Sequence, residues 1–146
     1  GLAGVYAVEN SRDAIFQSMK RREAFATTGP RIEPRFFVGR YSKNICSNKN
    51  WLALAYQQGT PMGSKLAAQL QPFQLLVQAK RDPLSNPLQK LQLVKGWIDR
   101  DWQKHAKVID LDAKGSGDNL CAVYDDPGWL MGSQSIAIEV AGLLRI

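Results

Sequence analysis

Short stretches in which apolar and polar residues alternate are the feature that most restricts how this chain can fold. In the clearest, residues 73–80, four apolar side chains are interleaved with Gln74, Gln78 and Lys80. A period of two predicts a half-buried strand. Similar stretches recur between turns rich in glycine, proline and asparagine, and no helical crossovers separate them. The sequence therefore predicts a mainly β fold, an antiparallel β-sandwich-like domain rather than a parallel α/β sheet.

The other predicted strands are short. They cover residues 24–28, 35–38, 51–56, 91–97, 108–111, 120–124 and 135–140. Pro34 cannot donate a hydrogen bond to a ladder, so the strand at 35–38 should begin there or lie at a sheet edge. Residues 2–8 are apolar and suit a buried strand or an extended entry segment. The stretches 40–50, 59–63 and 115–119 have the composition of loops and turns.

One N-terminal helix is predicted, from about Ser11 to Arg22. Asn10 or Ser11 supplies a cap, and the basic residues that end the segment suit the negative end of a helix dipole. Its apolar residues recur at helical spacing: Ile15, Phe16 and Met19. The helix therefore stands apart from the β pattern, and belongs either to one side of the sandwich or to a preceding domain.

Positive charge is concentrated in the first third of the chain. The formal net charge of this 146-residue protein is +6, and residues 1–50 hold nine basic groups against four acidic ones. Clustered cations attract polyanions because binding releases condensed counterions. The candidate anion contacts are Arg21, Arg22, Arg31 and Arg35. The competing interpretation is a basic surface that is simply solvated.

Cys46 and Cys121 are the only cysteines, and they lie far apart in the sequence. They can form a disulfide in an oxidising compartment, or remain two buried free thiols. A periplasmic or secreted location is therefore favoured over a cytoplasmic one. We predict no membrane span, because no apolar run approaches the length that crosses a bilayer.

Candidate catalytic and metal-binding residues are scarce. His105 is the only histidine, and the neighbouring lysines disfavour its protonation and its binding of a metal. A multinuclear metal site needs several imidazoles and carboxylates, so we expect neither a metal site nor a catalytic residue in this chain. The four tryptophans could instead form a surface that stacks on sugars, although core packing is the commoner role. They are Trp51, Trp97, Trp102 and Trp129.

Several segments resemble one bacterial protein family. They are Gly1 to Phe16, Lys20 to Ile32 with its Arg-Arg-Glu-Ala-Phe-Ala-Thr-Thr-Gly-Pro-Arg motif, Arg35 to Phe37, Gly59 to Leu66, Leu91 to Asp99 and, more weakly, Leu120 to Pro127. Together they are similar to the domain-of-unknown-function family thirty-six-oh-four, whose members look like metal-dependent phosphoesterases of the polymerase-and-histidinol-phosphatase (PHP) type. The sequence departs from the family pattern after Pro127.

The resemblance implies a place in a larger protein. Residues 1–32 would be the C-terminal strand, helix and strand of a PHP-like domain whose metal-binding residues come earlier, and residues 33–146 an accessory β-sandwich. We therefore expect a C-terminal fragment that is not an enzyme by itself and holds no cofactor. Its expected partners are the rest of the parent chain and, in a homo-oligomer, further copies of the same chain. Nucleic acid is not an expected partner. The alternative is an independent binding module for an anionic polymer, either nucleic acid or polysaccharide.

Overall fold

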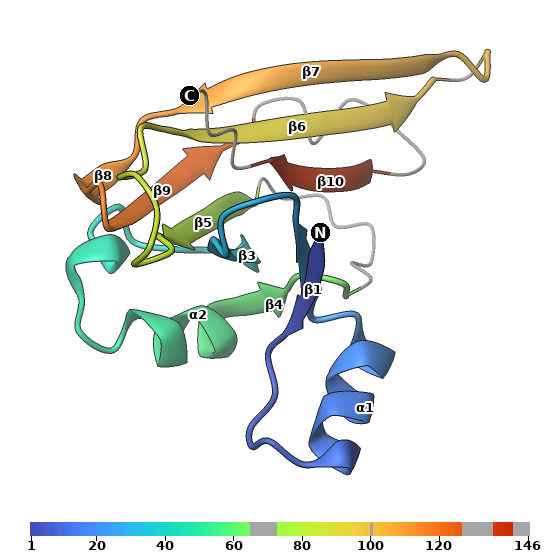
Figure 1. Cartoon of the computed structure of the whole chain (residues 1–146). Helices are drawn as coiled ribbons and strands as arrows, with labels where there is room; N and C mark the ends of the chain where they lie inside the picture. The colour runs from blue at the N-terminus through green and yellow to red at the C-terminus, as the bar shows by residue number, and fades with distance from the viewer. Residues whose placement is uncertain (65–72, 100, 127–135, 142–146) are drawn as a thin grey trace.

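The computed structural model describes residues 1–64, 73–99 and 101–126, and the backbone of 136–141. The chain is mainly β, and all strand pairs are antiparallel, as predicted (Figure 1). Its strands are β1 (Leu2–Val5), β2 (Ala24–Thr27), β3 (Glu33–Gly39), β4 (Gly59–Pro61), β5 (Gln74–Lys80), β6 (Leu91–Ile98), β7 (Lys104–Leu111), β8 (Lys114–Ser116), β9 (Asn119–Asp125) and β10 (Ile136–Ala141). Its helices are α1 (Arg12–Arg21), α2 (Trp51–Gln58) and the short 3₁₀ helix η1 (Ile45–Ser47).

Two sheets form the sandwich. One has five strands in the order β4-β3-β5-β9-β8, and the other has three in the order β10-β6-β7. The core between them contains alternate residues of β5, such as Leu75 and Val77, packed with Leu91 and Leu93 of β6. Because successive side chains of a strand point to opposite faces, the alternation places the apolar set of each strand in this core. The sandwich-like fold is confirmed.

The central strand β5 is buried on both faces. Leu75 and Val77 face the sandwich core, whereas Leu76 packs in a second core with Phe37 of β3 and Ala55 of α2. The sequence predicted a half-buried strand, and this was wrong because a further layer covers the sheet. That layer consists of α2 and η1, and Figure 1 shows it on the side of the five-stranded sheet away from β6 and β7.

The segment at 51–58 is a helix, so the prediction of a strand at residues 51–56 was wrong. Its sequence, Trp-Leu-Ala-Leu-Ala-Tyr-Gln-Gln, is rich in good helix formers and contains no β-branched residue. A short apolar run fits a strand or a buried helix equally well on periodicity alone. As a helix, the segment packs Trp51, Leu52 and Ala55 against the five-stranded sheet.

A disulfide joins the helical layer to the sheet. Cys46 lies in η1 and Cys121 in β9, with their Cα atoms 5.7 Å apart and their sulfur atoms 2.11 Å apart. Of the two arrangements that the sequence left open, the structure has the bonded one. The bridge spans 75 residues of sequence and sits in the second core.

Three further details refine the predicted boundaries. The expected loops at 59–63 and 115–119 contain the short edge strands β4 and β8. Pro34 is the second residue of β3, in the part of that strand that pairs with β5 alone, because β4 pairs only with Phe37–Gly39. The Met62 N–H donates to the Phe36 carbonyl, so even-numbered residues of β3 direct their backbone groups to the β4 side, and the missing N–H of Pro34 breaks no bond to β5. None of the described helices is long and apolar enough to cross a membrane.

The N-terminal unit, which we define as β1, α1 and β2, lies beside the sandwich (Figure 1). Strands β1 and β2 form a two-stranded sheet of their own. Helix α1 begins after Ser11, whose hydroxyl accepts a hydrogen bond from the Ala14 N–H at 3.2 Å, as a cap should. The predicted helix is confirmed. The buried alternative for residues 2–8 is wrong, because Leu2 and Val8 are exposed.

Candidate functional site

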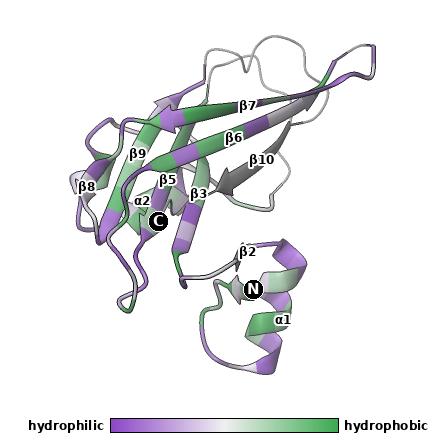
Figure 2. Cartoon of the chain, turned by 45° about the horizontal axis from the view of Figure 1, so that its top comes forward, coloured by the Kyte–Doolittle hydropathy of each residue, from purple (hydrophilic) through white to green (hydrophobic). Residues whose placement is uncertain are grey.

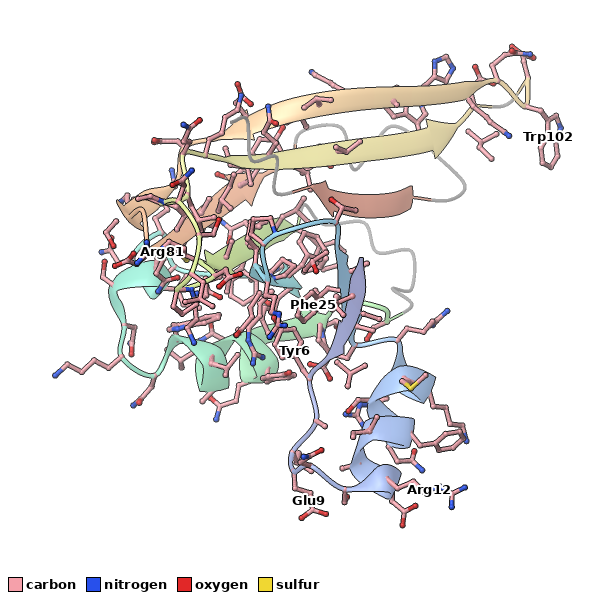
Figure 3. All side chains as sticks on the ribbon, viewed as in Figure 1. Tyr6, Glu9, Arg12, Phe25, Arg81 and Trp102 are labelled. Atoms are coloured by element: carbon pink, nitrogen blue, oxygen red, sulfur yellow. A yellow bond between two sulfur atoms is a disulfide. The ribbon has the colours of Figure 1, made fainter. Side chains whose placement is uncertain are left out.

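Polar and aromatic residues gather where the N-terminal unit meets the sandwich. We call Tyr6, Glu23, Arg35 and Tyr56 the junction cluster. Tyr6 and Glu23 flank the strands of the N-terminal unit, whereas Arg35 lies in β3 and Tyr56 in α2. The labelled side chains of Tyr6 and Phe25 lie side by side in this region (Figure 3), with ring centroids 5.3 Å apart. The cluster therefore joins four elements that are far apart in the sequence.

The end of α1 places Glu23 in this cluster. Arg22 adopts a left-handed conformation with φ of 60°, and its N–H donates to the Met19 carbonyl. This cap reverses the chain direction and leads directly into β2. The Glu23 N–H then donates to the Ser18 carbonyl, and the Tyr6 N–H donates to the Glu23 carbonyl at 3.1 Å. Glu23 is thus held by backbone bonds on both sides and is only 6% exposed.

Each charge in the junction cluster has a partner. The Tyr56 hydroxyl donates to Glu23 Oε1, and Arg21 Nη2 lies 3.6 Å from Glu23 Oε2. The Arg35 guanidinium carbon lies 3.7 Å from the centre of the Tyr6 ring, a cation–π contact. The Tyr6 hydroxyl donates to the Pro34 carbonyl at 2.9 Å. These contacts connect the N-terminal unit to β3 and α2.

The two tyrosines of the cluster resist ionisation. Burial raises the pKa of Tyr6 to about 12, against a smaller opposing effect of the Arg35 charge. Burial also raises the pKa of Tyr56 to about 12, and its hydrogen bond to Glu23 acts in the same direction. Both hydroxyls therefore remain hydrogen-bond donors through the physiological range. As donors they stabilise the Glu23 carboxylate and the Pro34 carbonyl, which suits a structural joint.

Chemically, the junction cluster contains a carboxylate paired with Arg21 and two tyrosine hydroxyls that already donate hydrogen bonds within the protein. Within the part of the chain that the structure describes, no three His, Cys, Asp or Glu residues lie close enough together to hold a metal ion. The residues of the cluster were not singled out from the sequence. The one sequence signal for this region was the positive charge of Arg21 and Arg35. The residues they contact come from distant segments, so no local pattern predicts the cluster.

The four predicted anion contacts have different surroundings in the structure. Arg35 belongs to the junction cluster and contacts Tyr6, and Arg21 lies beside the cluster and pairs with Glu23. The guanidinium of Arg21 also donates to the Ser18 hydroxyl at 3.1 Å. Arg22 caps α1, and the Arg31 backbone N–H donates to Asp82 on the loop after β5. The Asp82 carboxylate is thereby stabilised, which lowers its pKa.

The tip of the β6–β7 hairpin brings together the only histidine and two of the tryptophans. The rings of Trp97 and His105 stack with centroids 5.2 Å apart, and His105 Nε2 lies 2.7 Å from Asp99 Oδ2. Trp102 is 81% exposed and points away from the molecule (Figure 3). Trp51 packs beneath the five-stranded sheet instead, and Trp129 lies outside the described residues. The described tryptophans therefore do not form one stacking surface.

Comparison with known proteins places the chain in a family. The model of the family described as "Protein of unknown function (DUF3604)" matches residues 1–123. The chain belongs to this family. No curated protein and no solved structure matches it. The family description gives no activity, so functional arguments for this member of DUF3604 must come from its own residues.

Proposed function

We propose that the chain is a non-catalytic β domain of a larger PHP-like, metal-dependent hydrolase. In this proposal residues 1–32 complete the hydrolase domain, and residues 33–146 form an accessory sandwich that contributes packing, substrate access or oligomerisation. The metal ligands and the catalytic groups lie in the preceding polypeptide. The chain alone offers one histidine, and a PHP-type centre needs several imidazoles and carboxylates.

The observation that carries the proposal is the exposed apolar surface of the N-terminal unit. Phe16 and Met19 lie three residues apart in α1 and are 60% and 58% exposed. Residues at this spacing lie on the same side of a helix, and that side is usually turned towards a core. Leu2 and Val8 of the same unit are exposed as well. Figure 2 shows the apolar bands on α1, which stands apart from the strands of the sandwich.

A binding experiment tests this proposal. The polypeptide encoded immediately upstream of Gly1 would be produced separately and titrated with this chain by calorimetry. We expect binding, and we expect the double variant Phe16→Glu/Met19→Glu to abolish it, because two charges would have to be buried against apolar surface. Leu84→Glu is the matched control: Leu84 is 96% exposed on the loop after β5, so its variant should bind like the unchanged chain.

An activity assay completes the test. The joined polypeptides should hydrolyse an aryl phosphate ester in the presence of a divalent transition metal, and this chain alone should not. Turnover by this chain alone, or a stoichiometric metal cluster in it, would contradict the proposal. So would unchanged affinity of the Phe16→Glu/Met19→Glu variant for the upstream polypeptide.

The alternative, an independent module for anionic polymers, has less support. Arg21 and Arg35 already contact Glu23 and Tyr6, Arg22 is the cap residue of α1, and Arg31 lies in the segment held by Asp82. An anion site gains affinity from cations that converge on one ligand. Salt-dependent retention on heparin that falls in an Arg22→Ala/Arg31→Ala variant would favour this alternative.

A further inference from the structure

The outer edge of β7 is a long strand edge that no other strand of the described residues covers. Among the described strands, β7 ends the three-stranded sheet, with β6 as its one neighbour. Figure 1 shows it along the outer side of the molecule. The eight residues of β7 contain no proline, and the strand keeps an uninterrupted register with β6. Such an edge presents unpaired N–H and C=O groups to any strand of matching shape.

The hairpin turn shows which residues of β7 point their backbone groups outward. The Asp99 N–H donates to the Gln103 carbonyl, and the Trp102 N–H donates to the Asp99 carbonyl. Trp102 has a φ of 61°, as expected for the third residue of a three-residue hairpin loop. Asp99 and Gln103 are therefore a hydrogen-bonded pair, and so is every second pair along the ladder. It follows that odd-numbered residues of β7 bond to β6, and even-numbered residues point outward.

We propose that this edge pairs with β7 of a second copy of the chain, antiparallel and centred on Val108. A two-fold axis through Val108 places outward-pointing residues opposite one another: Val108 with Val108, Ala106 with Asp110, and Lys104 with Asp112. Lys104, Ala106, Val108 and Asp110 have the backbone orientation that a hydrogen-bonded pair requires, and Asp112 directly follows Leu111, the last residue of β7. The result is one continuous sheet across two molecules, a β-augmentation in which each copy supplies the same strand.

Side-chain chemistry selects this register. Val108 is 58% exposed, so its self-contact removes apolar surface from water. Each Lys104 faces an Asp112 of the other copy, which gives two opposite-charge pairs at the ends of the shared ladder. The neighbouring register, centred on Lys107, would instead place Lys107 directly against Lys107. It would also direct Lys104 to Asp110, whose carboxylate already contacts Gln92 at 2.5 Å and Lys90 at 3.5 Å.

The inference does not depend on the proposed hydrolase partner, because it concerns a different face. The exposed apolar residues of the N-terminal unit belong to β1, α1 and their connection, whereas the dimer edge belongs to β7. The two surfaces can therefore be disrupted separately. Loss of one interaction with retention of the other would identify which proposal fails.

Charge reversal tests the ion pairs of the dimer. Sedimentation of the unchanged chain should show a concentration-dependent dimer, with a dissociation constant on the order of micromolar, because the interface is small. Lys104→Glu and Asp112→Lys should each raise this constant by about tenfold, since each places like charges opposite one another twice. The double variant Lys104→Glu/Asp112→Lys restores opposite charges and should return to within about threefold of the original value. Circular dichroism checks that every variant is folded.

Cross-linking tests the register. Val108→Cys places two thiols opposite one another across the axis, within the range of a disulfide, and should give a covalent dimer under mild oxidation. In the same register Ala106→Cys places its thiols about 13 Å apart and should not cross-link. A monomer at about 1 mM protein would overturn the proposal. So would cross-linking by Lys107→Cys in place of Val108→Cys, or failure of the double charge reversal to restore association.

Discussion

The sandwich and the N-terminal unit use apolar residues in opposite ways. In the sandwich, β5 is covered on both faces, and Leu75, Leu76 and Val77 are at most 1% exposed. In the N-terminal unit, Phe16 and Met19 remain more than half exposed on a helix that lies beside the two-stranded sheet of β1 and β2. The central strand of the sandwich thus buries its apolar residues, whereas α1 leaves Phe16 and Met19 exposed. This difference is the basis of our proposal that the N-terminal unit packs against further polypeptide.

The largest effect should come from the disulfide, because it anchors the helical layer to the five-stranded sheet. Replacing both cysteines, in Cys46→Ala/Cys121→Ala, should lower the free energy of unfolding by about 4 kcal/mol, since the bridge closes a loop of 75 residues. Urea denaturation of the two proteins measures the difference. A loss below about 1 kcal/mol would mean that the helical layer holds to the sheet without the bridge.

A pair of truncations compares the two regions directly. Leu76→Ala should lower the free energy of unfolding by about 3 kcal/mol, because Leu76 is 0% exposed and its removal leaves a cavity. Phe16→Ala removes a larger side chain and should change the same quantity by less than about 0.5 kcal/mol. Equal losses of unfolding free energy in the two variants would contradict this contrast between the regions, because they would show that Phe16 is packed in solution.

The joint between the regions should have a smaller effect. Tyr56→Phe removes the hydroxyl that donates to Glu23 and should cost about 1 kcal/mol, since Arg21 still neighbours that carboxylate. The change should raise amide hydrogen exchange in β1 and β2 and leave β5 protected. Tyr41→Phe is a control inside the sandwich, where the hydroxyl donates to the Ala55 carbonyl at 3.2 Å. It should not alter exchange in β1 or β2.

The smallest effect concerns alkaline pH. Burial raises the pKa of Tyr56 from 10.0 to about 12 in the folded chain. The folded state therefore keeps a proton that the unfolded state loses, so the stabilising contribution is complete below pH 10 and falls as the pH rises towards 12. Urea midpoints measured across this interval should fall less steeply for Tyr56→Phe. An identical slope would show that the Tyr56 hydroxyl ionises normally and that the joint is open to water.

Parts of this architecture could be predicted because local chemistry agrees with the final fold. The period of two at residues 73–80 yielded β5, and the cap at Ser11 yielded α1. The helix α2 could not be predicted from periodicity, because a run of eight residues is too short to distinguish a strand from a buried helix. The junction cluster was missed for a different reason: Tyr6, Glu23 and Tyr56 show no pattern until the fold brings them together.

Local sequence alone was enough to establish that the chain is mainly β, that a helix lies near its N-terminus, and that it belongs with the DUF3604 proteins. These follow from side-chain periodicity, from capping and from a motif, which are all properties of neighbouring residues. The tertiary structure decided which faces are covered, that Cys46 meets Cys121, and that the edge of β7 stays open among the described strands. Such features depend on contacts between distant segments. These contacts contribute to the free energy of folding only when the layers pack together.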